Sequence, residues 1–171
     1  MLLLISTIAY TQGFWTQKAD FGGSPRWDAV GFSIGSKGYI GNGYDASIYF
    51  QDFWEWDEAT NIWTQKANFG GGTVEGCRGF SMGTKGYIGT GSSPTVRNDF
   101  WEWDQASDTW VQLANLTGAV RYESTAFSIG NKGYFGTGHN GSTFLRDFWE
   151  YTPATSASVE ENNFDMDISI F

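Results

Sequence analysis

The sequence has few of the residues that cross-link a small protein or bind a metal. Its 171 residues include one cysteine, Cys77, and one histidine, His139. A single cysteine cannot form an intramolecular disulfide. One cysteine and one histidine cannot supply the four ligands of a structural zinc site. We therefore expect no metal and no other cofactor, and we expect packing alone to hold the fold together.

Positive charge and long hydrophobic runs are also scarce. The chain has 10 Lys and Arg against 19 Asp and Glu, a net charge of −9. This excludes a basic surface for nucleic acid, since phosphates are neutralised by Lys and Arg. The apolar run Leu2–Ala9 is too short for a membrane span, which takes about 20 residues.

The same run has the length of a signal-peptide core, although no basic residue precedes it. We therefore predict a signal peptide at residues 1–11, with a buried first strand as the alternative.

Proline is rare, but glycine and aromatic residues are abundant. The chain has 3 Pro and 23 Gly, and 18% of its residues are aromatic. This composition is typical of short strands joined by tight turns. The sequence therefore predicts an all-β protein.

One twelve-residue motif occurs three times, which indicates an internal repeat. The copies are FSIGSKGYIGNG at residues 32–43, FSMGTKGYIGTG at 80–91 and FSIGNKGYFGTG at 127–138, so they begin 48 and 47 residues apart. Each copy contains a Gly-x-x-Gly turn, which predicts a hairpin. A variable loop, a DFWEWD or DFWEY segment and a Trp-containing segment complete each period.

Four short antiparallel strands in each period predict sheets that bury their faces against one another. We place three such units at residues 26–66, 74–113 and 121–151, within a repeat domain at residues 12–151. The third unit has Ser156-Ala157-Ser158 where its Trp segment is due. A surplus Trp segment at residues 14–18 could supply this strand and close the last unit.

These landmarks resemble the kelch repeat, whose period is about 50 residues. The matching pieces are GYIGTG, DFWEWD and the turn ending in DTW, and the resemblance runs from Phe14 to Tyr151. The chain has Gly-Asn-Gly or Gly-Thr-Gly where the family usually has Gly-Gly. The resemblance implies kelch-type β-propeller blades like those in the central domain of galactose oxidase.

Three blades are too few for a closed ring, because propellers typically have 4–8 blades. We expect an incomplete ring of about three four-stranded blades. One explanation is that the chain is part of a larger propeller. The other is a homodimer in which two chains form a six-bladed ring by exchanging their terminal strands.

Residues 152–171 differ in composition from the repeats, being rich in Ser, Ala and acidic residues. We interpret them as an acidic linker that ends in DISIF. This ending resembles the first strand of the C-terminal sorting domain of the bacterial type IX secretion system, truncated after that strand. Together with the export-like start, it implies a bacterial protein that is secreted or held at the cell surface.

Candidate binding residues lie where the repeats differ. The kelch resemblance implies that the strand beginning near Arg26 is innermost, so residues there would reach the end of the central channel. Three of these residues, Trp27, Tyr44 and Tyr122, could stack on sugar rings. Arg26 and Arg121 could instead form ion pairs that stabilise the rim. The predicted binding residues are Arg26, Trp27, Asp28, Glu75, Arg78, Arg121, Tyr122 and Glu123.

We predict a secreted, non-catalytic module that binds a glycan or a protein partner. One alternative is a sugar-processing enzyme similar to the sialic-acid mutarotases, which are also kelch propellers. Asp28, Glu75 and Glu123 could converge at a rim in that case, since glycosidases need paired carboxylates. The copper chemistry of galactose oxidase is excluded because His139 is the chain's one histidine. A purely structural spacer is the third possibility, and we assign no catalytic residue.

Overall fold

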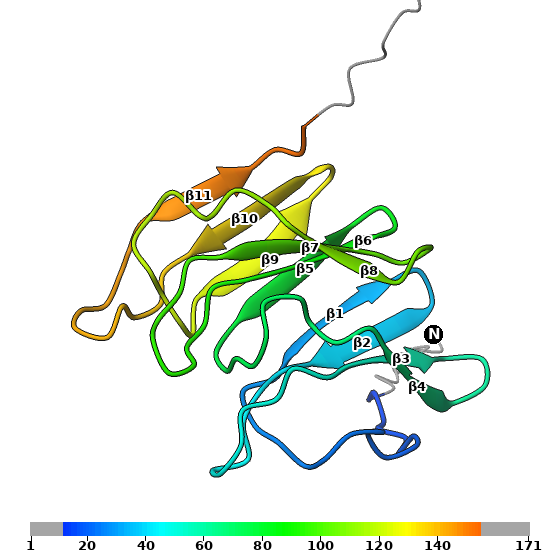
Figure 1. The fold of residues 1–171 in the computed structure, drawn as a ribbon. Coiled ribbons are helices and arrows are strands. Elements are labelled where there is room, and N and C mark those ends of the chain that lie inside the picture. Colours follow the sequence, from blue (N-terminus) through cyan, green and yellow to red (C-terminus); the bar gives the residue numbers. More distant parts are fainter. Residues whose placement is uncertain (1–11, 155–171) are drawn as a thin grey trace, which may run out of the picture.

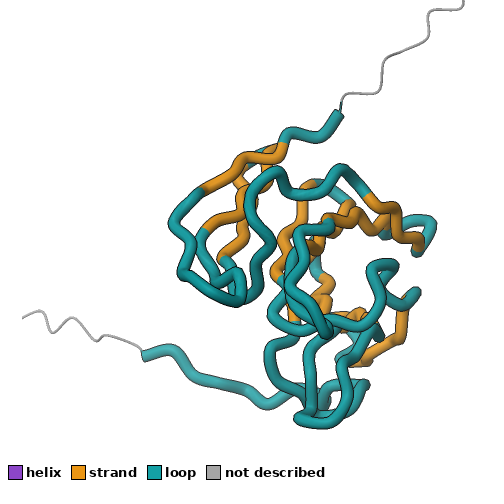
Figure 2. The backbone as a smooth tube through the Cα atoms, turned by 60° about the vertical axis from the view of Figure 1, so that its left-hand side comes forward, coloured by secondary structure: helices purple, strands orange, loops and turns teal. Residues whose placement is uncertain are grey.

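The computed structural model describes residues 12–154, which form strands, turns and loops without a helix in that range (Figure 2). The predicted signal peptide and the DISIF segment lie outside the described residues. Within them, none of the elements is a helix long and apolar enough to cross a membrane. The strands are β1 (Val30–Ile34), β2 (Lys37–Gly41), β3 (Phe53–Asp57), β4 (Ile62–Lys66), β5 (Arg78–Met82), β6 (Lys85–Gly89), β7 (Phe100–Asp104), β8 (Thr109–Gln112), β9 (Thr125–Ile129), β10 (Lys132–Gly136) and β11 (Phe148–Tyr151).

The strands form three separate antiparallel sheets, which lie side by side in chain order (Figure 1). We call β1-β2-β3-β4 blade 1, β5-β6-β7-β8 blade 2 and β9-β10-β11 blade 3. The register is the same in each blade, so that Phe32 lies opposite Tyr39, Phe80 opposite Tyr87 and Phe127 opposite Tyr134.

The Gly-x-x-Gly turns form hairpins as predicted. The first glycine of each turn is left-handed, with a φ of 57° at Gly35, 58° at Gly83 and 60° at Gly130. A side chain at these positions would be strained, since the left-handed region favours residues without a Cβ. The repeated glycine therefore fixes where each inner strand ends and turns back.

The core lies between blades rather than within them. One cluster joins Tyr39 and Phe53 of blade 1 to Ile88 and Trp103 of blade 2. A second joins Phe80, Tyr87 and Phe100 of blade 2 to Phe135 of blade 3. The inner strands β1, β5 and β9 lie against one another in that order. Blade-to-blade contact is thus the main source of hydrophobic burial.

The all-β prediction and the incomplete set of blades are confirmed: the sheets have four, four and three strands and do not close into a barrel. Blade 3 is the exception to the prediction of four strands, because among the described residues β11 pairs with β10 alone. The surplus segment at residues 14–18 is exposed and forms no strand. Figure 1 shows that blade 1 and β11 lie at opposite ends of the row of sheets.

Candidate binding site

The site is built from three equivalent segments, residues 26–28, 74–76 and 121–123, each just before the innermost strand of its blade. Each segment pairs with the loop that follows the second strand, through the isolated bridges Trp27–Tyr44, Glu75–Ser92 and Tyr122–His139. The Trp27 and Tyr44 amides, for example, each donate to the other's carbonyl, at 2.9 and 3.1 Å. Because the blades are equivalent, these segments meet at one end of the inner strands.

A pocket of about 400 Å³ lies where the three segments meet. Its lining combines two aromatic rings with three carboxylates: Trp27, Asp28, Glu75, Tyr122 and Glu123. All five belong to the predicted binding residues. The structure therefore brings together side chains that lie up to 96 positions apart in the sequence.

The backbone under the pocket is left-handed in every blade. The φ angles are 50° at Asp28, 62° at Gly76 and 52° at Glu123. Non-glycine residues in this region are strained, and such residues cluster at functional sites. The Glu123 amide donates to the Gly76 carbonyl at 2.8 Å, which links the segments of blades 2 and 3. A Cβ on Gly76 would meet the Asp28 Oδ2 atom at 3.3 Å, so glycine keeps the space between the acidic groups open.

The three carboxylates make the pocket acidic. Burial raises the pKa of Glu75 above its usual value, and the charges of Asp28 and Glu123 add to the effect. Arg78 offsets part of this charge, since its Nη1 atom lies 3.2 Å from Asp28 Oδ1. Within residues 12–154, no group of three His, Cys, Asp or Glu side chains is arranged to hold a metal ion. The carboxylates are therefore available as hydrogen-bond acceptors.

An aromatic platform extends the pocket on the side of blade 1. Trp27 is 63% exposed and stacks on Tyr44 with 6.2 Å between ring centroids. Tyr44 in turn stacks on Tyr49 at 4.5 Å. A second hollow next to the platform is lined by Trp27, Tyr44 and Asp45, among others. Trp27 thus stands between two hollows and presents its ring to solvent.

Arg26 and Arg121 lie beneath this surface. Arg26 holds Asp52 through two hydrogen bonds of 2.5 and 2.9 Å, and Arg121 holds Asp147 at 3.0 and 2.6 Å. Both arginine side chains are buried. The Arg121 guanidinium lowers the pKa of Asp147, as expected for a stable ion pair. The structure thus places both arginines in the ion pairs that formed the alternative interpretation of these residues.

Tyr49 is a site residue that the sequence reasoning missed. It lies in the variable loop of blade 1, and its counterparts by position in the bridges are Val96 and Phe144. An aromatic residue without an aromatic counterpart in blade 2 was the available signal. Its position in the stack depends on the loop folding back onto Tyr44, which the repeat pattern does not encode.

No protein-family model matches the chain, and no curated protein is similar to it in sequence.

Proposed function

We propose that this protein is a kelch-type propeller module, exported from a bacterial cell, that binds a neutral glycan without catalysis at the pocket of Trp27, Asp28, Glu75, Tyr122 and Glu123. The observation that carries the proposal is the exposed Trp27 ring, stacked on Tyr44 and adjoining a pocket with three carboxylates. The repeat landmarks support the kelch assignment, and the composition of the two ends supports export.

The chemistry of the pocket suits a sugar ring. A pyranose has an apolar C–H face and a rim of hydroxyl groups. The flat ring of Trp27 provides a large apolar surface for the C–H face. The carboxylates accept hydrogen bonds without donating any, so they pair with hydroxyl donors. Apolar walls with a few convergent polar groups are typical of ligand sites.

The charge of the pocket favours neutral glycans over acidic ones. An anionic sugar would lie against Glu75, whose pKa is already raised by burial and by Asp28 and Glu123. Like charges brought together at an interface cost several kcal/mol. Arg78 is engaged with Asp28, and Arg26 and Arg121 are buried. None of these cations faces the pocket free of a partner.

A glycan array that carries neutral and sialylated oligosaccharides tests this proposal. We expect binding to neutral members, followed by calorimetric titration with the best of them. Trp27→Ala should raise the Kd at least about tenfold, equal to about 1.4 kcal/mol, because aromatic anchors dominate binding energy. Phe14→Ala is the matched control, since Phe14 is equally exposed but lies outside the site. Binding that survives Trp27→Ala, or that prefers sialylated members, would contradict the proposal.

A sugar-processing enzyme is a second candidate, favoured by the environment of Glu75. A carboxyl with a raised pKa beside two further carboxylates is an arrangement that acid catalysis uses. The same array hits distinguish the two functions. An enzyme would change the bound sugar, which NMR detects as new anomeric signals or as accelerated anomer exchange, and Glu75→Gln would abolish the change.

A further inference from the structure

We propose that two copies of this chain associate head to tail, so that Trp15 of one copy fills a cavity beside β11 of the other and Phe127 of the second copy packs over Gly38 of the first. The proposal does not depend on the ligand-binding function.

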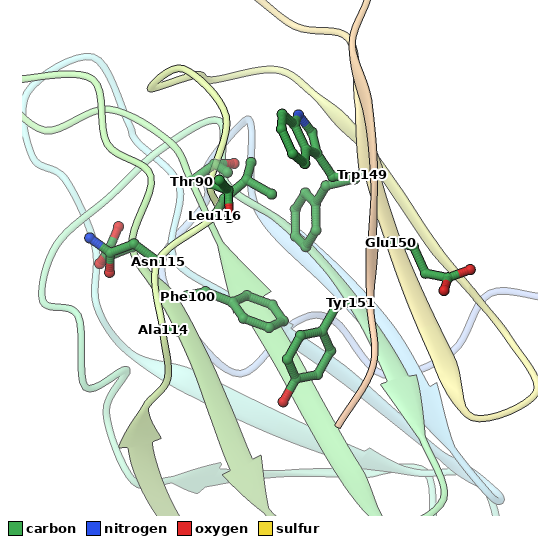
Figure 3. Close-up of a pocket in the computed structure, with 11 residues that line it drawn as sticks. Thr90, Phe100, Ala114, Asn115, Leu116, Trp149, Glu150 and Tyr151 are labelled. Carbon is green, nitrogen blue, oxygen red and sulfur yellow. The ribbon is translucent and has the colours of Figure 1, made fainter. Parts of the chain in front are cut away.

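The cavity lies between blades 2 and 3. It has a volume of about 160 Å³ and is lined by Phe100, Leu116, Tyr151 and neighbouring residues (Figure 3). A cavity of about 150 Å³ accommodates a benzene ring. The space between these blades is therefore large enough for an aromatic side chain.

Blade 2 shows what fills the equivalent space between blades 1 and 2. There the ring of Trp110 on β8 lies 5.2 Å from Phe53 and 5.0 Å from Phe69, with Trp103 at 6.3 Å. Counted along the repeat, the counterparts of these three residues are Phe100, Leu116 and Tyr151. The three residues that line the cavity are thus those that would surround a Trp on a fourth strand of blade 3.

The chain carries such a strand at residues 14–18. Its sequence FWTQK differs from β4, IWTQK, at its first residue alone. Trp15, the counterpart of Trp63 and Trp110, is fully exposed. On blade 1 the Trp63 indole donates to the Ala19 carbonyl at 3.3 Å, and on blade 2 Trp110 donates to Ala67 at 3.1 Å. The next residue in this series is Ala114, which lines the cavity.

The opposite face of the same interface contains a second matched pair. Gly86 and Gly133 sit under the rings of Phe32 and Phe80: a Cβ there would lie 2.4 and 2.0 Å from the Phe Cζ atoms. Gly38, their counterpart in blade 1, has no ring above it among the described residues, and its Cβ would meet nothing closer than Trp56 at 3.7 Å. Phe127 is the counterpart of Phe32 and Phe80, and it is 39% exposed on blade 3.

Both pairs belong to one arrangement. Ala19 contacts blade 1, through its amide bond to Asn61 Oδ1 at 3.0 Å, just as Ala67 contacts blade 2 through Asp108 at 3.1 Å. The strand before Ala19 therefore points to the blade that precedes blade 1. If blade 3 of a second copy takes that place, Phe127 covers Gly38 and residues 14–18 pair with β11. Two such interfaces give six blades, within the 4–8 of closed propellers.

Light scattering on the purified full chain tests the association. We expect twice the 19.0 kDa mass of one chain. Trp15→Ser and Gly38→Leu should each shift the protein to the monomer, and circular dichroism should show that both remain folded. Gly38→Leu is informative because it blocks the contact without an internal clash. Phe144→Ser, which also removes an exposed ring, should leave the dimer intact. A monomeric wild type, or a dimer that neither variant weakens, would overturn the proposal.

Cross-linking then tests the register. Glu55 lies opposite Thr64 and Glu102 opposite Val111, so Thr16 should lie opposite Glu150 of the second copy. The double variant Thr16→Cys/Glu150→Cys should oxidise to a covalent dimer on a non-reducing gel. Thr16→Cys/Glu102→Cys is the control, since β8 already covers Glu102. Cys77 is buried and should not interfere. Equal cross-linking of the two pairs would overturn the strand exchange.

Discussion

Blades 2 and 3 carry the same three aromatic residues in the same register, yet the two sets differ in burial. In blade 2, Phe80 is 3% exposed and Phe100 5%, because Phe135 of blade 3 packs against both rings. In blade 3, Phe127 is 39% exposed and Phe148 57%. The stacking within each set is nevertheless alike, with 5.2 Å between Phe80 and Tyr87 and 5.5 Å between Phe127 and Tyr134.

The difference shows that the local fold of a blade and the burial of its face have separate causes. Turns and strand register place the three rings in one stack, whatever lies beside them. Burial comes from the neighbouring blade alone. A blade at the end of the row therefore presents a preformed apolar surface, and exposed patches of this kind are typical of interaction sites.

Truncation of the equivalent rings gives the largest expected contrast. Phe80→Ala should lower the free energy of unfolding by about 3–5 kcal/mol, since it leaves a cavity in the core. Phe127→Ala should cost less than about 1 kcal/mol, as exposed positions do. Both are measured by urea denaturation in the Gly38→Leu background, which removes the contribution of the proposed dimer. Equal losses would show that Phe127 is buried by a neighbour even in the monomer.

The glycines under the rings give the next largest contrast. Gly133→Ala would place a Cβ 2.0 Å from Phe80 Cζ, and overpacking of this kind costs about 1–3 kcal/mol. Gly38→Ala meets nothing closer than 3.7 Å and should change the free energy of unfolding by less than about 0.5 kcal/mol. Urea denaturation of the two variants in the same monomeric background measures the difference. A loss at Gly38 as large as that at Gly133 would mean that the two positions are not equivalent.

The sequence predicted the repeated parts of the fold because repetition itself marks the packing. Gly35 and its counterparts located the hairpins, and the aromatic-acidic segments became β3, β7 and β11. It did not predict that residues 14–18 would lie apart from any sheet, because a strand needs a partner edge as well as a suitable sequence. Blade 1 and β11 lie at opposite ends of the row.

The candidate site was predictable in part. Trp27, Asp28, Glu75, Tyr122 and Glu123 were found because they vary within a constant frame, and the structure places them around one pocket. The separate position of Arg26 and Arg121 depends on Asp52 and Asp147, which lie in the repeated DFWE segments. The sequence could pair these charges but could not show on which side of the backbone they meet.

The ion pairs at the outer ends of blades 2 and 3 give the smallest expected contrast. Lys85 pairs with Asp104 in blade 2, whereas Thr152 stands at the equivalent position of blade 3. The hydrogen bond from Lys85 and those from the Ser107 and Ala106 amides lower the pKa of Asp104 to about 2. Asn at position 104 can keep the turn but loses the charge. Asp104→Asn should therefore lower the Tm slightly at pH 7.

The pH dependence of that loss is the decisive measurement. Because the folded pKa of Asp104 lies below its unfolded value of 3.8, the carboxylate stabilises the fold above pH 3.8, and this contribution disappears as the pH falls through about 2. The Tm difference between the wild type and Asp104→Asn should shrink over the same interval. Thr152→Asp, which offers Lys132 the missing partner, should raise the Tm of blade 3's edge at pH 7 and lose the gain in acid. A pH-independent difference at Asp104 would assign its effect to the turn and would remove the ion pair from the contrast between the two blades.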